Sequence, residues 1–184
     1  MATYQGRQYL EQQLDTILAQ TVPVKILISD DGSDDGTREM LDNYAGWYPE
    51  QVVLHHRTEH TGGAAGNFFW LMQEALKDEK NEYILFSDQD DVWENDKVSV
   101  MLHRMKVLEK GLGSACPILL YSDMEVVDEE LYEISPSFAS YTHQDPDRSS
   151  FAELLVENQV TGGASMINRA LLMRCAKAPE VCCM

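Results

Sequence analysis

The chain has 184 residues, a hydrophobic fraction of 44% and a net charge of −17, from 31 acidic and 14 basic residues. This length fits a single domain, residues 1–184, with a sizeable core, and the negative charge argues against nucleic acid as a partner because phosphates require a basic face. The sequence contains no apolar run near the ~20 residues of a membrane span and no recognisable secretory signal, so the cytoplasm is the expected compartment.

Short β-rich runs alternate along the chain with stretches of helical periodicity, and each kind of pattern predicts its own element. In chain order we expect a helix at 7–20, a strand at 24–29, a helix at 36–44, a strand at 52–55, a helix at 62–77, a strand at 82–86, a helix at 96–110, a strand at 118–122, the start of a hairpin at 125–128, an irregular segment at 134–149, a helix at 149–158, a short strand at 164–167 and a helix at 169–176. This alternation predicts an α/β fold whose central sheet is mostly parallel and flanked by helices.

The two ends of the chain suggest a fragment. Residues 1–4 lead directly into a helix, where an α/β sheet would normally place a full strand, and residues 181–184 form no polar tail or final element. We therefore expect that part of the first strand and a C-terminal region are missing. An exposed sheet edge left in this way would favour pairing between chains, so a homo-oligomer is a possible state.

Two acidic clusters directly follow predicted strands: Ser29–Ser33 (SDDGS) and Ser87–Asp91 (SDQDD). Open α/β sheets bind ligands at the carboxyl ends of their strands, so the two clusters are expected to contribute to one site. Asp88 and Asp90 are spaced i and i+2 and can point to the same side of an extended turn. Two carboxylates suit Mg²⁺ or Mn²⁺, whose remaining ligands are waters and substrate phosphates.

Simpler structural roles compete with this interpretation. The second acidic turn could be a loop whose following helix is capped by Asp96, and Asp34 could cap the helix at 36–44, with Gly32 supplying a positive φ. Acidic spacing over residues 31–42 also resembles an EF-hand loop, although a strand rather than a helix enters it. An acidic phosphoryl-accepting pocket, which needs a lysine or threonine at a later strand end and for which the chain offers Lys97 and Thr161, is a further alternative.

The remaining chemistry-bearing residues are expected to be structural. Gly62–Gly66 lacks the spacing of a phosphate-binding loop and predicts a helix start built from small residues. His55 and His56 alternate along a strand and are expected at the surface. We expect Trp70 in the core, and Trp93 to pack, with stacking on a sugar as its alternative role. The four cysteines show no zinc-ligand spacing and are expected to be free thiols.

Four motifs in fixed order resemble a known family. They are Met1–Gly6 (MATYQG), Ile17–Thr21 (ILAQT), Asp30–Thr37 (DDGSDDGT) and Ser87–Trp93 (SDQDDVW). Together they are similar to the family 2 glycosyltransferases, and more narrowly to rhamnosyltransferase-like bacterial members. The resemblance implies a GT-A fold, a UDP-, dTDP- or GDP-sugar donor, a glycan or lipid-linked acceptor, a Mg²⁺ or Mn²⁺ ion, and inversion at the anomeric carbon.

The resemblance also implies roles for individual residues. Those near the nucleobase and ribose come from the first and third motifs, those near the diphosphate come from the fourth motif, and a Gly-Gly pair borders the donor sugar and acceptor. The nucleotide-sugar-binding residues implied are Ala2, Thr3, Tyr4, Asp30, Asp31, Gly66, Asn67, Asp88, Gln89, Gly162 and Gly163, and the metal ligands implied are Asp88 and Asp90.

The same family places its general base in a motif that would follow Met184, so no catalytic residue is assigned within the chain. A direct displacement needs a carboxylate to accept the proton of the acceptor hydroxyl. The expectation is therefore a glycosyltransferase whose residues 1–184 bind the donor and transfer sugar slowly. The alternative is a nucleotide-sugar-binding module with little or no turnover.

Overall fold

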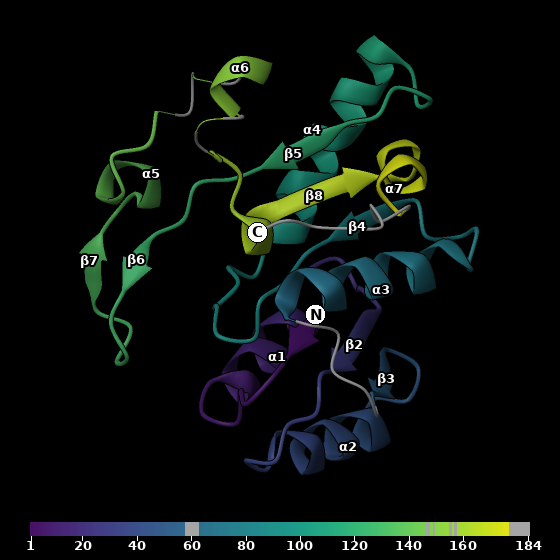
Figure 1. The fold of residues 1–184 in the computed structure, drawn as a ribbon, viewed down its shortest axis with the longest axis vertical. Coiled ribbons are helices and arrows are strands. Elements are labelled where there is room, and N and C mark those ends of the chain that lie inside the picture. The colour runs from purple at the N-terminus through teal and green to yellow at the C-terminus, as the bar shows by residue number, and fades with distance from the viewer. Residues whose placement is uncertain (58–62, 146–147, 149, 155, 157, 177–184) are drawn as a thin grey trace.

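A three-stranded parallel sheet occupies the first part of the chain (Figure 1). In this computed structural model, which describes residues 1–57, 63–145, 148, 150–154, 156 and 158–176, the strands β1 (Ala2–Thr3), β2 (Ile26–Asp30) and β3 (Val52–His56) lie in the order β1-β2-β3. The register pairs Thr3 with Asp30, and Asp30 with His56. The carboxyl ends of all three strands therefore lie side by side at one edge.

Two amphipathic helices pack on this sheet. Helix α1 (Leu10–Leu18) buries Leu10, Leu14 and Ile17, which recur at the i, i+4, i+7 spacing of one helix face. Helix α2 (Thr37–Trp47) likewise buries Met40, Leu41 and Tyr44. These side chains join the strand residues Ile26, Ile28 and Val52 in one apolar cluster, which fixes both helices against the sheet.

A second three-stranded sheet follows, with β4 (Tyr83–Leu85), β8 (Ser165–Asn168) and β5 (Leu119–Tyr121) in the order β4-β8-β5. Strand β8 runs antiparallel to both of its neighbours. The α/β class is confirmed, but the expectation of a mostly parallel sheet has to be corrected for this half. Parallel strands are joined by a crossover connection, usually a helix, whereas the segment that joins β5 to β8 is made of short strands and short helices, and the two strands pair antiparallel.

Three helices pack around the second sheet: α3 (Ala64–Leu76), α4 (Lys97–Leu112) and α7 (Arg169–Cys175). Helices α3 and α7 share an apolar cluster with β8, built on Met72, Ile167 and Leu172. Helix α4 contributes Met101 and Met105 to another cluster, which includes Met166 of β8. The buried strand β8 is thus covered by apolar side chains from both directions.

The chain between β5 and β8 is more structured than expected. It contains β6 (Val126–Val127), β7 (Glu133–Ser135), α5 (Phe138–Tyr141), α6 (Phe151–Leu154) and a 3₁₀ turn, η1 (Gly162–Ala164). The predicted irregular segment at 134–149 is wrong for β7 and α5, because polar residues there pair and cap locally; Ser137, for example, caps α5 through Ser140 N. The predicted helix at 149–158 is observed over α6, while residues 149, 155 and 157 lie outside the described residues. The β6–β7 hairpin and α5 stand away from the rest of the fold (Figure 1).

Helix α1 begins at Leu10 rather than at residue 7, and the starts of α2 and α3 follow glycines with positive φ. Gly36, with φ of 96°, is the N-cap of α2, and Asp35 Oδ1 accepts hydrogen bonds from Thr37 N and Oγ1 at 3.0 and 2.6 Å. Asp34 was predicted as this cap, and it contacts Gln5 instead. Helix α3 begins at Ala64 after Gly63, with φ of 120°, and Gly62 lies outside the described residues.

Two further features concern membrane-spanning helices and the state of the cysteines. Within the described residues, no helix has the length and apolar character needed to cross a membrane. Cys116 and Cys175 are free thiols, as predicted, while Cys182 and Cys183 fall outside the described part of the chain.

Asn168 holds the second sheet to its helices. Its side chain is 1% exposed; Oδ1 accepts from Leu171 N at the start of α7 (3.1 Å) and from Ile118 N (3.0 Å). Its Nδ2 donates to Glu109 Oε1 of α4 (3.0 Å) and to Cys116 O (2.8 Å). One buried amide therefore ties β8, α7, α4 and the segment before β5 together.

We expect Asn168→Ala to lower the free energy of unfolding by about 3 kcal/mol, because it removes a helix cap and leaves buried polar groups without partners. Urea unfolding followed by far-UV circular dichroism measures this. Asn43→Ala, at an exposed position in α2, is the matched control and should change stability by less than about 0.5 kcal/mol. A loss for Asn168→Ala no larger than for Asn43→Ala would contradict the assignment.

Candidate functional site

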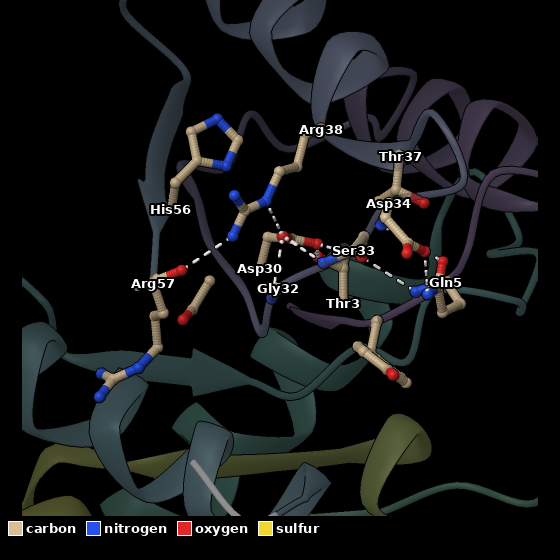
Figure 2. A network of polar contacts seen from close by, with 12 residues as sticks. Thr3, Gln5, Asp30, Gly32, Ser33, Asp34, Thr37, Arg38, His56 and Arg57 are labelled. Carbon is tan, nitrogen blue, oxygen red and sulfur yellow. Dashed lines mark hydrogen bonds and ion pairs between the residues drawn. The ribbon is translucent and has the colours of Figure 1, made fainter. Parts of the chain in front are cut away.

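The site is organised around Asp30, the last residue of β2, whose side chain is fully buried. Its Oδ1 accepts hydrogen bonds from Ser33 Oγ (2.5 Å) and Thr3 Oγ1 (3.2 Å). Its Oδ2 accepts from Gly32 N (3.2 Å) and Ser33 N (3.0 Å) and pairs with Arg38 Nε at 2.8 Å. Figure 2 shows these groups converging on one carboxylate from β1, the turn after β2, and α2.

These contacts decide the ionisation state of Asp30. Burial alone opposes the charged form, but the hydrogen bonds from Ser33, Arg38 and Thr3 outweigh it and hold the pKa of Asp30 below its ordinary value. Arg38 also donates from Nη2 to Arg57 O at 2.8 Å, and Arg57 N donates to Asp30 O at 3.0 Å. The carboxylate therefore fixes the ends of β1, β2 and β3 through internal partners.

The loop after β1 is laid against the first acidic turn. Gln5 N donates to Ser33 Oγ (2.9 Å), and Gln5 Nε2 donates to Asp34 Oδ1 (2.6 Å), as Figure 2 shows. Gly6 N donates to Thr37 Oγ1 at 2.9 Å. A strand enters this turn, so the EF-hand alternative is excluded.

A side-chain amide links the loop after β1 to the second acidic turn. Gln89 Oε1 accepts from Tyr4 N, and Gln89 Nε2 donates to Tyr4 O, both at 2.9 Å. A Cβ on Gly6 would lie 2.4 Å from Gln89 Oε1, so glycine at this position leaves room for the amide. Both acidic turns thus contact the loop after β1, the first through Gln5 and the second through Tyr4.

Three polar residues in and just after α1, which sequence reasoning missed, hold the second turn in place. Gln13 Nε2 donates to Ser87 Oγ (2.8 Å) and Asp88 O (3.1 Å), and Thr16 Oγ1 accepts from Trp93 N (3.1 Å). Gln20 donates to Glu94 O (2.7 Å) and accepts from Val98 N (3.0 Å). Their i, i+3, i+7 spacing on one helix face was the available signal, because it matches the period of a buried stripe.

Asp88 and Asp91 crowd against the 3₁₀ turn η1. A Cβ built on Gly163 would lie 2.8 Å from Asp88 Oδ2 and 2.6 Å from Asp91 Oδ2, so only glycine permits this approach. Burial and the neighbouring charge of Asp90 raise the pKa of Asp88, although a hydrogen bond from the Gly163 main chain opposes this. Burial and the charge of Asp88 raise the pKa of Asp91. These carboxylates repel one another at short range.

Lys97, the first residue of α4, provides a positive charge beside this cluster. Its Nζ donates to Gly163 O at 3.1 Å and lies 4.3 Å from the centre of the Trp93 ring. Trp93 is 5% exposed, so its predicted packing role is confirmed. Asp96 is the N-cap residue of α4, but its side chain makes no capping hydrogen bond, which removes the simple structural role offered for it.

The other predicted site residues take the following places. Asn67, 2% exposed in α3, donates from Nδ2 to Ser29 O at 2.9 Å and joins α3 to β2, and Gly66 is half-buried beside it. Asp31 is buried at the carboxyl end of β2, where its N donates to Thr3 O (2.9 Å), and Ala2 is half-buried in β1. Gly162 is exposed and has open space where a side chain would lie.

The aromatic and histidine residues near β3 are structural. His56 Nε2 lies 2.8 Å from Asp42 Oδ1, and the His55 ring packs edge-on against Trp70 at 5.0 Å. Trp70 is half-buried rather than fully in the core, because its other contact is the Arg57 guanidinium, 4.9 Å from its ring centre. Neither histidine belongs to the acidic site.

An apolar cavity of about 580 Å³ lies elsewhere, between the two sheets. Its lining includes Leu27, Met72, Ile84 and Leu85, and it contains none of the acidic residues at 30–31 or 88–91. Its charged lining residues, among them Lys25, Glu74 and Lys80, are of both signs, and the acidic turns remain the candidate site because they follow strand ends.

The donor atoms at the second turn suit a hard divalent cation. Magnesium-type ions are held by one or two carboxylates, with substrate phosphates completing the shell, and the mutual repulsion at Asp88 is what such a cation would relieve. Across the described ranges, no set of three or more acidic, histidine or cysteine side chains is arranged around a common metal position. The residues therefore fit an open, two-carboxylate site at Asp88 and Asp90, completed by a ligand.

Comparison with known proteins adds independent information. A family model described as glycosyl transferase family 2 matches residues 1–174. The chain is 39% identical over 99 residues to dTDP-rhamnosyl transferase RfbG of Shigella flexneri, covering 53% of this chain and 34% of that protein. It is 32% identical over 170 residues to the putative teichuronic acid biosynthesis glycosyltransferase TuaG of Bacillus subtilis, covering 90% of this chain and 64% of that protein.

Solved structures share the fold. The structure of S. aureus TarS 1–349 in complex with UDP-GlcNAc matches with a TM-score of 0.53 at 18% identity, over 70% of this chain and 34% of that chain. At this identity the likeness concerns the fold alone. The chain spans about a third of RfbG and about two thirds of TuaG in length.

We expect Asp30→Asn to lower the free energy of unfolding by about 3 kcal/mol at pH 7, because it leaves Arg38 and the Ser33 amide with a mismatched partner. The native pKa of Asp30 is depressed, so its contribution is fully present above the unfolded pKa, near 3.9, and is lost as pH falls through the native value. Urea unfolding of both proteins from pH 7 to pH 3 measures the difference. A stability gap that stays constant below pH 4 would contradict the role of the charge.

Proposed function

The chain belongs to glycosyl transferase family 2, and on this basis we propose that it binds a nucleotide-diphosphate sugar and transfers the sugar, with inversion, to a cell-envelope glycan. Two of the relatives that match it above 30% identity support this proposal through their names: one is a dTDP-rhamnosyl transferase and the other is named as a putative teichuronic acid biosynthesis glycosyltransferase. The fold is the GT-A fold of this family. A dTDP-sugar is the first donor to test.

The proposed donor site runs from β1 to the second acidic turn. Thr3, Tyr4 and Asp31 lie at the strand ends and would face the base and ribose, while Asp88 and Asp90 would hold the diphosphate through a cation. Asp30 has an indirect role in this proposal, because its carboxylate oxygens already bind Thr3, Ser33 and Arg38. It positions the strand ends rather than meeting the donor.

A divalent cation bound at Asp88 and Asp90 would neutralise the charge that develops on the leaving diphosphate. The chain's own residues prepare this position. Gln13 fixes the main chain of Asp88, and Gly163 lets the carboxylates approach the η1 turn. Because the protein carries a net charge of −17, a cation between it and a diphosphate also removes a strong repulsion. In the proposed reaction the acceptor hydroxyl attacks the anomeric carbon on the face opposite the leaving diphosphate. Its proton passes to a base that we do not assign.

One observation carries the proposal: the crowding of Asp88 and Asp91 against Gly163, beside Asp90. Carboxylates placed this close destabilise one another unless a cation joins them. A structural acidic loop would instead spread its charges into solvent. The cluster also lies beside the strand ends where α/β sheets bind ligands.

The first test is a calorimetric titration of dTDP, UDP and GDP with and without Mn²⁺. We expect one nucleotide to bind at least about tenfold more tightly with Mn²⁺, and Asp90→Asn to remove that gain, because the bridging carboxylate is lost. Asp96→Asn removes the same charge from an exposed position in the following turn and should leave the gain intact. Equal nucleotide affinity with and without Mn²⁺ would show the metal assignment to be wrong.

Turnover separates the enzyme from a binding module. Metal-dependent release of nucleotide from the donor indicates a transferase, even when water replaces the acceptor. Binding without any release over hours would favour the alternative, a nucleotide-sugar-binding module.

A pair of glycine variants tests the geometry of the cluster. Gly163→Ala places a methyl group 2.6–2.8 Å from two carboxylate oxygens and is expected to weaken Mn²⁺-dependent nucleotide binding by about tenfold or more. Gly162→Ala meets no atom within 4 Å and should change affinity less than twofold. The same calorimetry applies to both. Equal affinities for the two variants would mean that the close approach is unimportant.

A further inference from the structure

The side chain of Lys97 lies beside three parts of the proposed donor site: the η1 turn, Trp93 and the acidic turn. It begins α4, immediately after the acidic turn, and its side chain is half-buried. Its ammonium donates to the main-chain oxygen of Gly163 in the η1 turn at 3.1 Å. It also lies 4.3 Å above the ring of buried Trp93, which limits where the ammonium can move.

The same ammonium lies within the field of two carboxylates. Burial lowers the pKa of Lys97, while the charges of Asp91 and then Asp88 favour its protonated form. The effect is reciprocal, because Lys97 favours the ionised forms of both carboxylates. Gly163 connects the three groups: its oxygen accepts from Lys97, and Asp91 Oδ2 and Asp88 Oδ2 occupy the space that a Cβ would need.

The cluster contains one carboxylate more than a phosphate-bound cation requires. Asp88, Asp90 and Asp91 crowd together, yet magnesium-type ions that bind substrate phosphates usually take only one or two protein carboxylates. Asp91 is more buried than the exposed Asp90 and lies against Gly163, on the side where Lys97 binds the turn. Lys97 therefore places positive charge beside the third carboxylate, across Gly163.

We propose that Lys97 is a positioning residue that acts as a fixed counter-ion to Asp91 and fastens the η1 turn, so that Asp88 and Asp90 are left for a single divalent cation. The inference rests on the proposed function, since it concerns the same cation. It adds that Asp91 is not a metal ligand, although it is part of the acidic turn. It also assigns the position of the Gly162–Ala164 turn to a side chain from α4.

The proposal predicts the direction in which removal of the Lys97 charge changes metal affinity. A fixed ammonium repels a divalent cation nearby, so removing it should strengthen metal binding while loosening the turn. Damage to the fold would do the opposite and weaken metal binding. The two explanations for a defective Lys97 variant therefore predict opposite changes in metal affinity.

The experiment measures Mn²⁺ binding without nucleotide, from the electron paramagnetic resonance signal of free Mn²⁺, for wild type, Lys97→Met and Lys97→Arg. We expect Lys97→Met to bind Mn²⁺ about tenfold more tightly and Lys97→Arg to stay within about threefold of wild type. Lys106→Met removes the same charge from an exposed position of the same helix and should leave affinity unchanged. Unchanged or weaker Mn²⁺ binding by Lys97→Met would overturn the proposal.

Variants of Asp90 and Asp91 test which of these carboxylates binds the metal ion. Asp90→Asn should weaken Mn²⁺ binding at least about thirtyfold, and Asp91→Asn less than about threefold. The double variant Lys97→Met with Asp91→Asn removes both members of the pair and should return to within about threefold of wild type. A loss in Asp91→Asn equal to that in Asp90→Asn would make Asp91 a ligand and overturn the proposal.

A second measurement is independent of any ligand. Amide hydrogen exchange in peptides covering residues 160–166 should be faster in Lys97→Met and unchanged in Lys97→Arg, because only the former frees Gly163. If wild type binds no nucleotide but these exchange rates change as expected, the proposed function fails while the role of Lys97 in fastening the turn stands. If nucleotide binds with Mn²⁺ and neither exchange nor Mn²⁺ affinity responds to Lys97→Met, the role of Lys97 fails alone.

Discussion

The buried carboxylate of Asp30 is the constraint on which the site depends. It lies at the end of the central parallel strand, out of contact with water, and a charge in that position is tolerated only where hydrogen bonds and a counter-ion surround it. The partners come from β1, the following turn and α2, so satisfying one carboxylate sets the relative position of three elements. Asp30 therefore also determines the positions of Thr3 and Asp31, which flank the proposed donor site.

The second acidic turn is held by different means. Polar side chains of α1 bind its main chain, and the Gln89 amide joins it to Tyr4 in the way that a neighbouring strand would. The turn can therefore keep its carboxylates together against their repulsion, because hydrogen bonds from elsewhere prevent them from separating. Positive charge beside it comes from Lys97 of α4. The protein thus concentrates negative charge at a point where its main chain is firmly fixed.

Much of this arrangement could be predicted from the sequence. The apolar spacing of α1, α2 and α4 gave those helices, and the acidic turns at strand ends gave the site. The direction of β8 could not be predicted, since the sequence of a short apolar strand does not indicate which strands it pairs with or whether the pairing is parallel. Gln13, Thr16 and Gln20 were missed because glutamine and threonine on a helix usually face water, and only the burial of Gln13 and Gln20 reveals their role. The function of Lys97 depends on a contact with Gly163, 66 residues away along the chain.

Both carboxylate oxygens of Asp30 are bound by partners within the protein, and this limits how related sequences can diverge at this position. A residue whose oxygens bind three elements of its own protein cannot be exchanged to suit a different nucleobase without loosening the strand ends. Tyr4, by contrast, is 52% exposed and contributes its main chain, not its phenol ring, to the link with Gln89. Changes in base preference among relatives should therefore accumulate at position 4 and leave position 30 unaltered, so that one scaffold serves many donors.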